Sequence, residues 1–499
     1  MTMSELQAVE KGIDQRASEP LSTKVVRGGL WVLALRFVNR CLRFIRTIIL
    51  ARLLVPEDFG LFGIAMLAIA TLEALTQTGF ETALVQKKEN VESYLDTTWT
   101  ISAMRGVLLF CILVFSAPLI ASFFNSPQAT LIIRVISISA LLSGFKNVGL
   151  IFFQKELEFN KQFFYEFSSI LTYLIVAVTL AFALRNVWAL VWGGLAASLV
   201  RLVMSYKVHH YRPRLNLRRK EFQELFVFGK WLFGSGLLVF LITQGDDIFV
   251  GKMLGPATLG LYQMAYLISN LPVTEISRTM AQVAFPAYSK LQDDLIRLRD
   301  AYLKALHLTT FCSIPLAVGI FLLAPDFTRI CMGAKWVPMV PAIKVLVLAG
   351  LIRSIAATAG PIFYGIGRPK IDTLWQTIRL IILVILIYPL TQRWGIFGTS
   401  IAVLSSISVA TFGFSLGVIR ITKCGTYNFV RTLFVPAVNS IIMSAVIVFL
   451  KIHIQINAIF SLILLVIAGI ITYLLATKLY DTFFNYEIGK IIRNNLKIH

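Results

Sequence analysis

Four arginines recur within an apolar stretch near the start of the chain, at a spacing that places them along one side of a helix. They are Arg36, Arg40, Arg43 and Arg46, and Asn39 falls in the same stripe. At about 100° per residue, the five side chains lie within roughly 120° of the helix surface. Guanidinium groups bind carboxylates and phosphates through two parallel charge-assisted hydrogen bonds. The stripe therefore predicts an anion-binding surface.

The cost of exposing these arginines to lipid supports that prediction. Each arginine facing lipid at mid-membrane would cost about 2.5–3.5 kcal/mol, so the stripe must face protein or water. Two alternatives are a helix lying flat on an anionic membrane surface and a set of internal ion pairs. The segment at 229–250, which matches this one in an internal repeat, is typical of a membrane span and speaks against the flat helix. Internal ion pairs are disfavoured because few acidic residues are available.

Acidic residues inside other apolar stretches are candidates for a second kind of chemistry. They are Asp246, Asp247, Glu73 and Glu275. Burial raises the pKa of a carboxyl group and a nearby arginine lowers it, so such a residue can bind a proton or a cation conditionally. We interpret these four residues as candidates for ion coupling. For Asp246 or Asp247, the alternative is a fixed ion pair with an arginine of the stripe.

The remaining polar patterns favour structural roles over catalysis. No P-loop, HExxH or GxSxG pattern occurs, and the histidines and cysteines lack metal-ligand or disulfide spacing. Glu57 and Asp58 lie in a short turn, where a helix N-cap is expected. We therefore predict a protein that is not an enzyme and has no metal and no cofactor. Structural roles are also expected for five basic residues, namely Arg105, Arg134, Lys230, Lys304 and Lys344.

The composition indicates a chain solvated largely by lipid. Of its 499 residues, 57% are hydrophobic and only 15% are charged, whereas soluble domains carry about 25% charged residues. The net charge of +21 is explained by lysines and arginines in cytoplasmic loops beside anionic lipid. No basic soluble domain is evident, so nucleic acid is not expected as a partner.

Fourteen apolar windows of about 20 residues predict membrane spans, all helical because backbone polar groups in lipid must be paired within the segment. They lie at 30–50, 59–80, 98–120, 130–152, 164–184, 187–205, 229–250, 259–281, 302–324, 339–361, 374–392, 396–418, 430–450 and 456–477. With both termini in the cytoplasm, the inner loops and tails hold 26 Lys and Arg residues and the outer loops hold 7. This asymmetry follows the positive-inside rule. The first span is expected to stay as an anchor.

The sequence of the turn that follows the arginine stripe, at 54–61, recurs at 254–261, an offset of 200 residues. Leu54, Pro56, Gly60 and Leu61 correspond to Leu254, Pro256, Gly260 and Leu261. Spans one and seven therefore correspond, which predicts two parallel six-helix repeats around a central cavity, followed by a C-terminal helix pair. The predicted domains are a cytoplasmic tail at 1–29, an N-lobe at 30–222, a C-lobe at 223–424, and two extra helices with a cytoplasmic tail at 425–499.

Four segments at and beyond these turns resemble the polysaccharide transporter family. They are LARLLVPEDFGLFGIA at 50–65, FVGKMLGPATLGLY at 249–262, VAFPAYSKLQDD at 283–294 and GAKWVPMVPAIKVL at 333–346. The family comprises Wzx-type oligosaccharide flippases, including colanic-acid and teichuronic-acid exporters, within the multidrug/oligosaccharidyl-lipid/polysaccharide exporter superfamily. The resemblance covers roughly residues 25–480, which is most of the chain.

The resemblance implies an all-α integral membrane protein of about fourteen helices in the bacterial inner membrane. Its implied partners are membrane lipids and an undecaprenyl-pyrophosphate-linked oligosaccharide, which it would flip by alternating access for surface polysaccharide synthesis. A proton or sodium ion could couple transport, and the arginine stripe would bind the pyrophosphate. The alternatives are a drug/cation antiporter of the same superfamily, a lipid II flippase, and a membrane-embedded glycosyltransferase or polymerase. The arginines speak against the antiporter, and the short outer loops speak against the enzyme.

Overall fold

The computed structural model describes residues 38–77, 79–80, 84, 91–155, 159–453 and 457–484. Side chains are described in the same ranges except at 154, 159, 220–233, 235, 271–279, 281–283 and 483–484. Every regular element in these ranges is a helix, which confirms the predicted all-α class. The chain divides into two compact units, Met1–Phe240 and Leu241–His499.

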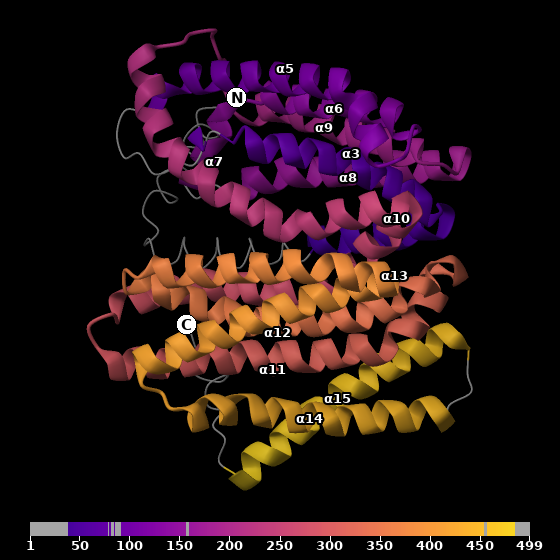
Figure 1. Cartoon of the computed structure of the whole chain (residues 1–499), viewed down its shortest axis with the longest axis vertical. Coiled ribbons are helices and arrows are strands. Elements are labelled where there is room, and N and C mark those ends of the chain that lie inside the picture. The colour runs from indigo at the N-terminus through magenta and orange to yellow at the C-terminus, as the bar shows by residue number, and fades with distance from the viewer. Residues whose placement is uncertain are drawn as a thin grey trace, which may run out of the picture. The chain divides into compact units, whose positions relative to one another are not determined.

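In the first unit, the first described helix comprises residues 38–53. It continues with α3 (Pro56–Leu75), α5 (Val91–Phe123), α6 (Ala129–Gly144), η1 (Val148–Leu150), α7 (Ile151–Lys155), α8 (Phe159–Leu184) and α9 (Trp188–Val208). Within this unit α8 packs on α9 and α5 packs on α6 (Figure 1). A Cβ added to Gly106 would lie 2.8 Å from the Cα of Gly144, so these glycines let α5 and α6 approach closely.

The second unit contains the larger part of α10 (Arg219–Lys290) and all later helices. These are α11 (Leu295–Phe327), η2 (Thr328–Met332), η3 (Ala334–Met339), α12 (Val340–Gly365), α13 (Pro369–Thr422), α14 (Thr426–His453) and α15 (Ala458–Phe484). In this unit α11 packs on α12 and α14, and α14 packs on α15 (Figure 1). The buried side chains of Tyr302, Phe363 and Phe414 join α11, α12 and α13 in one core.

Single glycines interrupt the two longest helices. Gly255 in α10 has a φ of 81° and Gly395 in α13 has a φ of 56°, values that residues with a Cβ rarely adopt. Each helix therefore consists of two segments. With these segments counted separately, the described ranges contain fourteen helices of 16 residues or more, one for each predicted span. This agrees with the predicted fold class of about fourteen membrane helices.

The repeated turn has the same consequence for the backbone in both units. In the first unit the helix ends before Pro56, and Val55 is extended with φ −96° and ψ 161°. In the second unit Gly255 breaks α10 immediately before Pro256. Proline disfavours helical geometry in the residue before it and is well placed at the first helical position after it. The N-cap position is occupied by Val55 rather than by either of the predicted acidic residues, and Asp58, the third residue of the new helix, accepts from the Val55 N–H at 3.0 Å.

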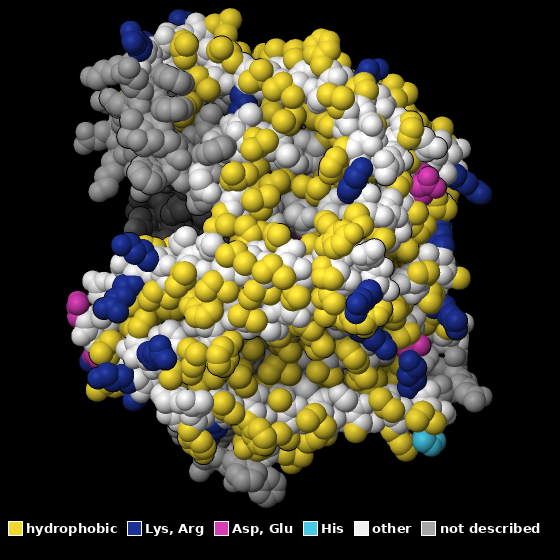
Figure 2. Space-filling view, in the orientation of Figure 1, with side chains coloured by type: hydrophobic (Ala, Val, Ile, Leu, Met, Phe, Trp, Pro, Cys, Tyr) yellow, Lys and Arg dark blue, Asp and Glu magenta, His cyan; other side chains and the backbone are white. Residues whose placement is uncertain are grey.

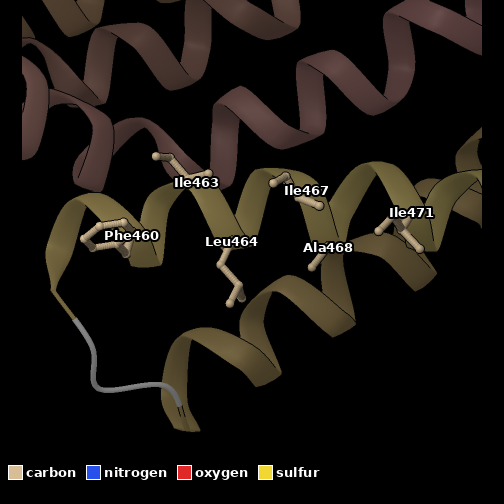
Figure 3. A pocket seen from close by; sticks show the side chains of 6 residues that line it. All are labelled: Phe460, Ile463, Leu464, Ile467, Ala468 and Ile471. Carbon is tan, nitrogen blue, oxygen red and sulfur yellow. The ribbon is translucent and has the colours of Figure 1, made fainter.

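Apolar side chains cover much of the molecular face shown in Figure 2. On α5, Phe115 is 81% exposed and Leu119 is 74% exposed, which suits contact with lipid rather than water. Figure 3 shows an apolar groove on α15, lined by Phe460, Ile463, Leu464, Ile467, Ala468 and Ile471. Because hydrocarbon side chains line this groove, it suits lipid acyl chains and is distinct from the polar sites described below.

Hydrogen bonds fix the extended segment between α9 and α10 onto the N-terminal part of α5. The N–H of Arg214 donates to Asp96 Oδ1 at 3.1 Å, and the N–H of Asn216 donates to Thr100 Oγ1 at 3.0 Å. The Tyr211 hydroxyl also donates to Asp96. Burial and the bond to Asp96 raise the pKa of Tyr211, so this hydroxyl stays a donor well into the alkaline range.

Replacing Tyr211 by phenylalanine is expected to loosen this segment without unfolding the protein. Loss of the hydrogen bond to Asp96 should cost about 1 kcal/mol, and trypsin cleavage at the nearby arginines should accelerate about fivefold. Since the folded pKa is raised, the stabilisation is present below the ordinary tyrosine pKa of about 10 and is lost at higher pH. The matched control is Tyr427→Phe, at a 75% exposed position. Equal cleavage of both variants would contradict the prediction.

Candidate functional site

The first described helix presents four of the five residues of the predicted anion-binding stripe, and Arg36 lies outside the described residues. Arg43 is exposed, Arg40 and Arg46 are half-buried, and Asn39 is buried. The Oδ1 atom of Asn39 has no hydrogen-bond partner among the described residues. Buried polar atoms are nearly always paired in proteins, so an oxygen without a partner at this position is unusual.

An aromatic ring holds Arg46 at the C-terminal end of the stripe. Its Cζ lies 4.0 Å from the ring centroid of Tyr173 on α8, which is a cation–π contact. The Tyr173 hydroxyl donates to the carbonyl oxygen of Leu190 on α9 at 3.4 Å. Leu50 and Leu54 belong to the same buried cluster as Leu190. Packing thus orients this end of the helix against α8 and α9.

In the second unit, the break at Gly255 brings two parts of α10 together around Asp246 and Asp247, which are called the acidic pair from here on. The Tyr262 hydroxyl donates to Asp246 Oδ2 at 2.7 Å, and Gln263 Nε2 donates to Asp247 Oδ2 at 3.3 Å. Asp246 is only 3% exposed, and its Oδ1 has no hydrogen-bond partner among the described residues. A buried carboxylate oxygen in this state can take a proton or a cation.

Two arginines that the sequence did not nominate as site residues lie close to this acidic pair. Arg353 on α12 donates through Nη1 to the Tyr266 hydroxyl at 2.7 Å and to Asn270 Oδ1 at 3.1 Å. Arg379 on α13 is near enough to Arg353 and Asp246 for their charges to interact. The arginines could have been found as charges inside apolar stretches. Tyr266 and Asn270 carry no such signal in the sequence.

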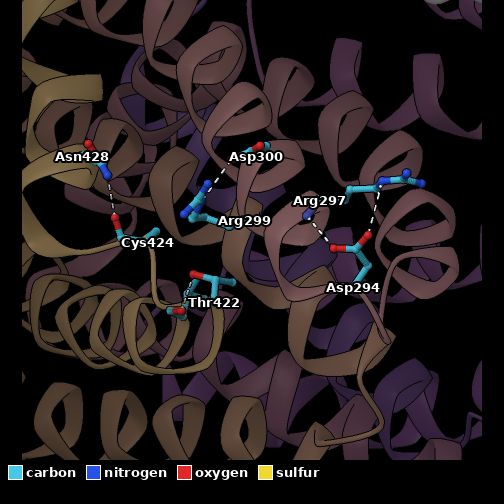
Figure 4. A network of polar contacts seen from close by, with 8 residues as sticks. Asp294, Arg297, Arg299, Asp300, Thr422, Cys424 and Asn428 are labelled. Carbon is cyan, nitrogen blue, oxygen red and sulfur yellow. Dashed lines mark hydrogen bonds and ion pairs between the residues drawn. The ribbon is translucent and has the colours of Figure 1, made fainter.

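The ion pairs of the described residues lie at helix ends. They are Arg297–Asp294 at 3.3 Å, Arg299–Asp300 at 3.0 Å and Lys451–Asp326 at 2.5 Å, the first two shown in Figure 4. Asp294 also caps α11, since its Oδ1 accepts from the Arg297 N–H at 3.1 Å. Neither Asp246 nor Asp247 forms an ion pair with a described residue of its own unit. The alternative pairing with an arginine of the stripe stays a prediction.

The other two acidic candidates lie on α3 and α10. Glu73 is exposed near the C-terminal end of α3, and Glu275 belongs to α10 with its side chain outside the described residues. Arg105 donates to Thr76 Oγ1 and to the Glu73 carbonyl oxygen, both at 3.0 Å. It caps the end of α3, a structural role such as the sequence predicts. In the described part of the chain, no three His, Cys, Asp or Glu side chains gather as metal ligands.

The architecture defines the class of protein. The described residues form fourteen long helices with an apolar exterior, and one unit holds hydrogen-bonded charges in its interior, features that are typical of a multi-span membrane transporter. The chain belongs to the polysaccharide biosynthesis protein family, whose model matches residues 49–341. This match confirms the resemblance noted in the sequence.

Known proteins of related sequence and fold agree with this assignment. The lipopolysaccharide biosynthesis protein WzxC of Escherichia coli is 26% identical over 389 residues, covering 77% of this chain and 78% of that protein. The teichuronic acid biosynthesis protein TuaB of Bacillus subtilis is 27% identical over 337 residues, covering 67% of this chain and 69% of that protein. The lipid II flippase MurJ, in an inward closed conformation, has a similar fold with a TM-score of 0.74 at 17% identity, covering 91% of this chain and 99% of MurJ.

Proposed function

We propose that this protein flips an oligosaccharide linked to undecaprenyl pyrophosphate across the bacterial inner membrane, for the synthesis of a surface polysaccharide. The observation that carries the proposal is the family match. Relatives named for lipopolysaccharide and teichuronic acid biosynthesis are similar to this chain over two thirds or more of its length. A fold similar to that of a lipid II flippase supports it. In this proposal the protein is a transporter, and its partners are the lipid-linked glycan and membrane lipids.

The arginine stripe would bind the pyrophosphate of this substrate. A pyrophosphate carries several oxygens that accept charge-assisted hydrogen bonds, and arginine supplies such donors in pairs. Arg43 is exposed and Arg40 is half-buried, so both present surface beyond the part of the helix that packs on α8 and α9. Asn39 would add an amide group beside them.

Transport would proceed by alternating access between an N-lobe at 30–222 and a C-lobe at 223–424. The repeated turns at Pro56 and Pro256 support this proposal, because parallel repeats provide two similar bodies that can rock against each other. Residues 425–499 would form an appended helix pair and tail. Both termini would lie in the cytoplasm, as the excess of basic residues in the inner loops favours.

A proton or a sodium ion would couple to transport at Asp246 and Asp247. The buried Asp246 Oδ1, which has no hydrogen-bond partner among the described residues, supports this assignment. Binding of a cation there would alter the charge balance with Arg353 and Arg379 on the neighbouring helices. The second unit would then differ in energy between its loaded and empty states.

The proposed function is tested with purified protein in liposomes that contain a fluorescent undecaprenyl-pyrophosphate oligosaccharide. An impermeant quencher distinguishes glycan in the outer leaflet from glycan in the inner leaflet. We expect the leaflets to exchange glycan only when the protein is present. Exchange of lipid II but not of the oligosaccharide would favour a lipid II flippase. Uptake of an organic cation without glycan exchange would favour a drug/cation antiporter.

A further inference from the structure

A groove lies between the first and the last turns of α13, separate from the acidic pair and its arginines. Because the helix is broken at Gly395, the indole of Trp375 meets Gly413 even though 38 positions separate them. The groove has a volume of about 330 Å³, and its lining includes Ile371 and Leu416 as well as these two residues. Its size is at the lower end of the range for ligand pockets in proteins.

A glycine sets the depth of the groove. A Cβ added to Gly413 would lie 2.2 Å from the ring of Trp375, so any larger residue would push the indole away. With glycine at this position the ring packs directly on the backbone of the second α13 segment. The wall is therefore apolar, made by an indole and by aliphatic side chains from both segments. Tryptophan is enriched where membrane helices reach the polar headgroups.

Two cations flank this apolar wall. Arg368 immediately precedes α13 and Arg420 lies two residues before its end, and both side chains are exposed and line the groove. No described residue pairs with either guanidinium group, whereas Arg297 and Arg299, at the start of α11, each form an ion pair (Figure 4). The carboxylate of Asp372, on the first turn of α13, accepts from the Tyr364 hydroxyl at 2.9 Å. The groove thus combines two unneutralised cations with an apolar wall.

We propose that this groove binds an anionic phospholipid, with its phosphate between Arg368 and Arg420 and an acyl chain against Trp375 and Leu416. Basic pockets between membrane helices near the headgroup level bind lipids of this class. A small soluble anion would use the arginines but would leave the apolar wall unoccupied. The pyrophosphate of the proposed glycan substrate has related chemistry, so the experiment must separate the two ligands.

Native mass spectrometry of the purified full-length protein, titrated with phosphatidylglycerol, tests the proposal. We expect the variants Arg368→Gln and Arg420→Gln each to bind about fivefold more weakly, and the double variant about 25-fold more weakly. Binding of phosphatidylcholine, a zwitterion whose net charge is zero, should not change. The matched control is Arg393→Gln, an exposed arginine of α13 next to the break at Gly395. If the double variant is unstable, the loss of phosphatidylglycerol binding in the single variants still tests the proposal.

Three results would overturn the proposal. The first is equal affinity for phosphatidylglycerol in the double variant and in Arg393→Gln. The second is displacement of phosphatidylglycerol by glycerol phosphate, which lacks acyl chains, at the same concentration, because the groove would then be a site for bare phosphate. The third is preferential displacement by undecaprenyl pyrophosphate, which would place the groove on the substrate path. None of these outcomes depends on whether the glycan transport assay succeeds.

Discussion

Replacing both Arg40 and Arg43 by alanine is expected to block export of the lipid-linked glycan while the protein stays in the membrane at normal abundance. Each arginine would lose a charge-assisted interaction with the pyrophosphate, worth about 1.5–3 kcal/mol. The combined loss corresponds to transport at least about 100-fold slower in the liposome assay. Arg46 is less suited to this test, because its contact with Tyr173 gives it a structural role within the first unit.

Two further variants separate binding from folding in this experiment. Lysine at positions 40 and 43 should restore export only in part, because an ammonium group keeps the charge but loses the paired donor geometry. Arg52→Ala removes an exposed arginine from the same helix outside the stripe and should transport glycan normally. Normal export by the double alanine variant, at normal abundance, would end the anion-binding hypothesis. Loss of abundance in this variant but not in Arg52→Ala would indicate a role in folding.

Replacing Asp247 by asparagine is expected to remove the dependence of transport on a proton or sodium gradient. Asparagine has nearly the same shape and can still accept from Gln263, but it cannot take up a proton or offer a negative charge to a cation. Gradient-driven transport should fall at least about tenfold, which corresponds to about 1.4 kcal/mol of lost coupling. Asp246→Asn should have a similar effect, because the two carboxylates are adjacent on α10.

The matched control for the acidic pair is Tyr262→Phe. This change removes the 2.7 Å hydrogen bond to Asp246 Oδ2 but keeps both carboxylates. It should cost about 1–3 kcal/mol of stability, because a buried acceptor loses its partner, while the dependence on the ion gradient persists. If Asp247→Asn lowers only the amount of folded protein and leaves the gradient dependence intact, the acidic pair is structural and the coupling hypothesis fails.

The sequence alone was sufficient to predict the helices and the turn that the two units share. Apolar windows of sufficient length predict helices directly, because a chain in lipid must satisfy its backbone hydrogen bonds within each segment. Pro56 and Pro256 mark the restart of a helix through local geometry, which requires no knowledge of distant contacts. The hydrogen bond that Asp58 accepts is equally local, since its carboxylate reaches a backbone N–H only three residues away.

Only the tertiary structure decided which polar groups meet. Tyr262 lies 16 positions from Asp246 and would be far from it on a straight helix, but the break at Gly255 allows the hydrogen bond between them. Arg353 on α12 donates a hydrogen bond to Tyr266 on α10 although 87 positions separate them in the sequence. Such partners depend on how helices cross, and crossing is set by side-chain packing along whole helices rather than by any short motif. The charges were therefore visible in the sequence, whereas their partners were not.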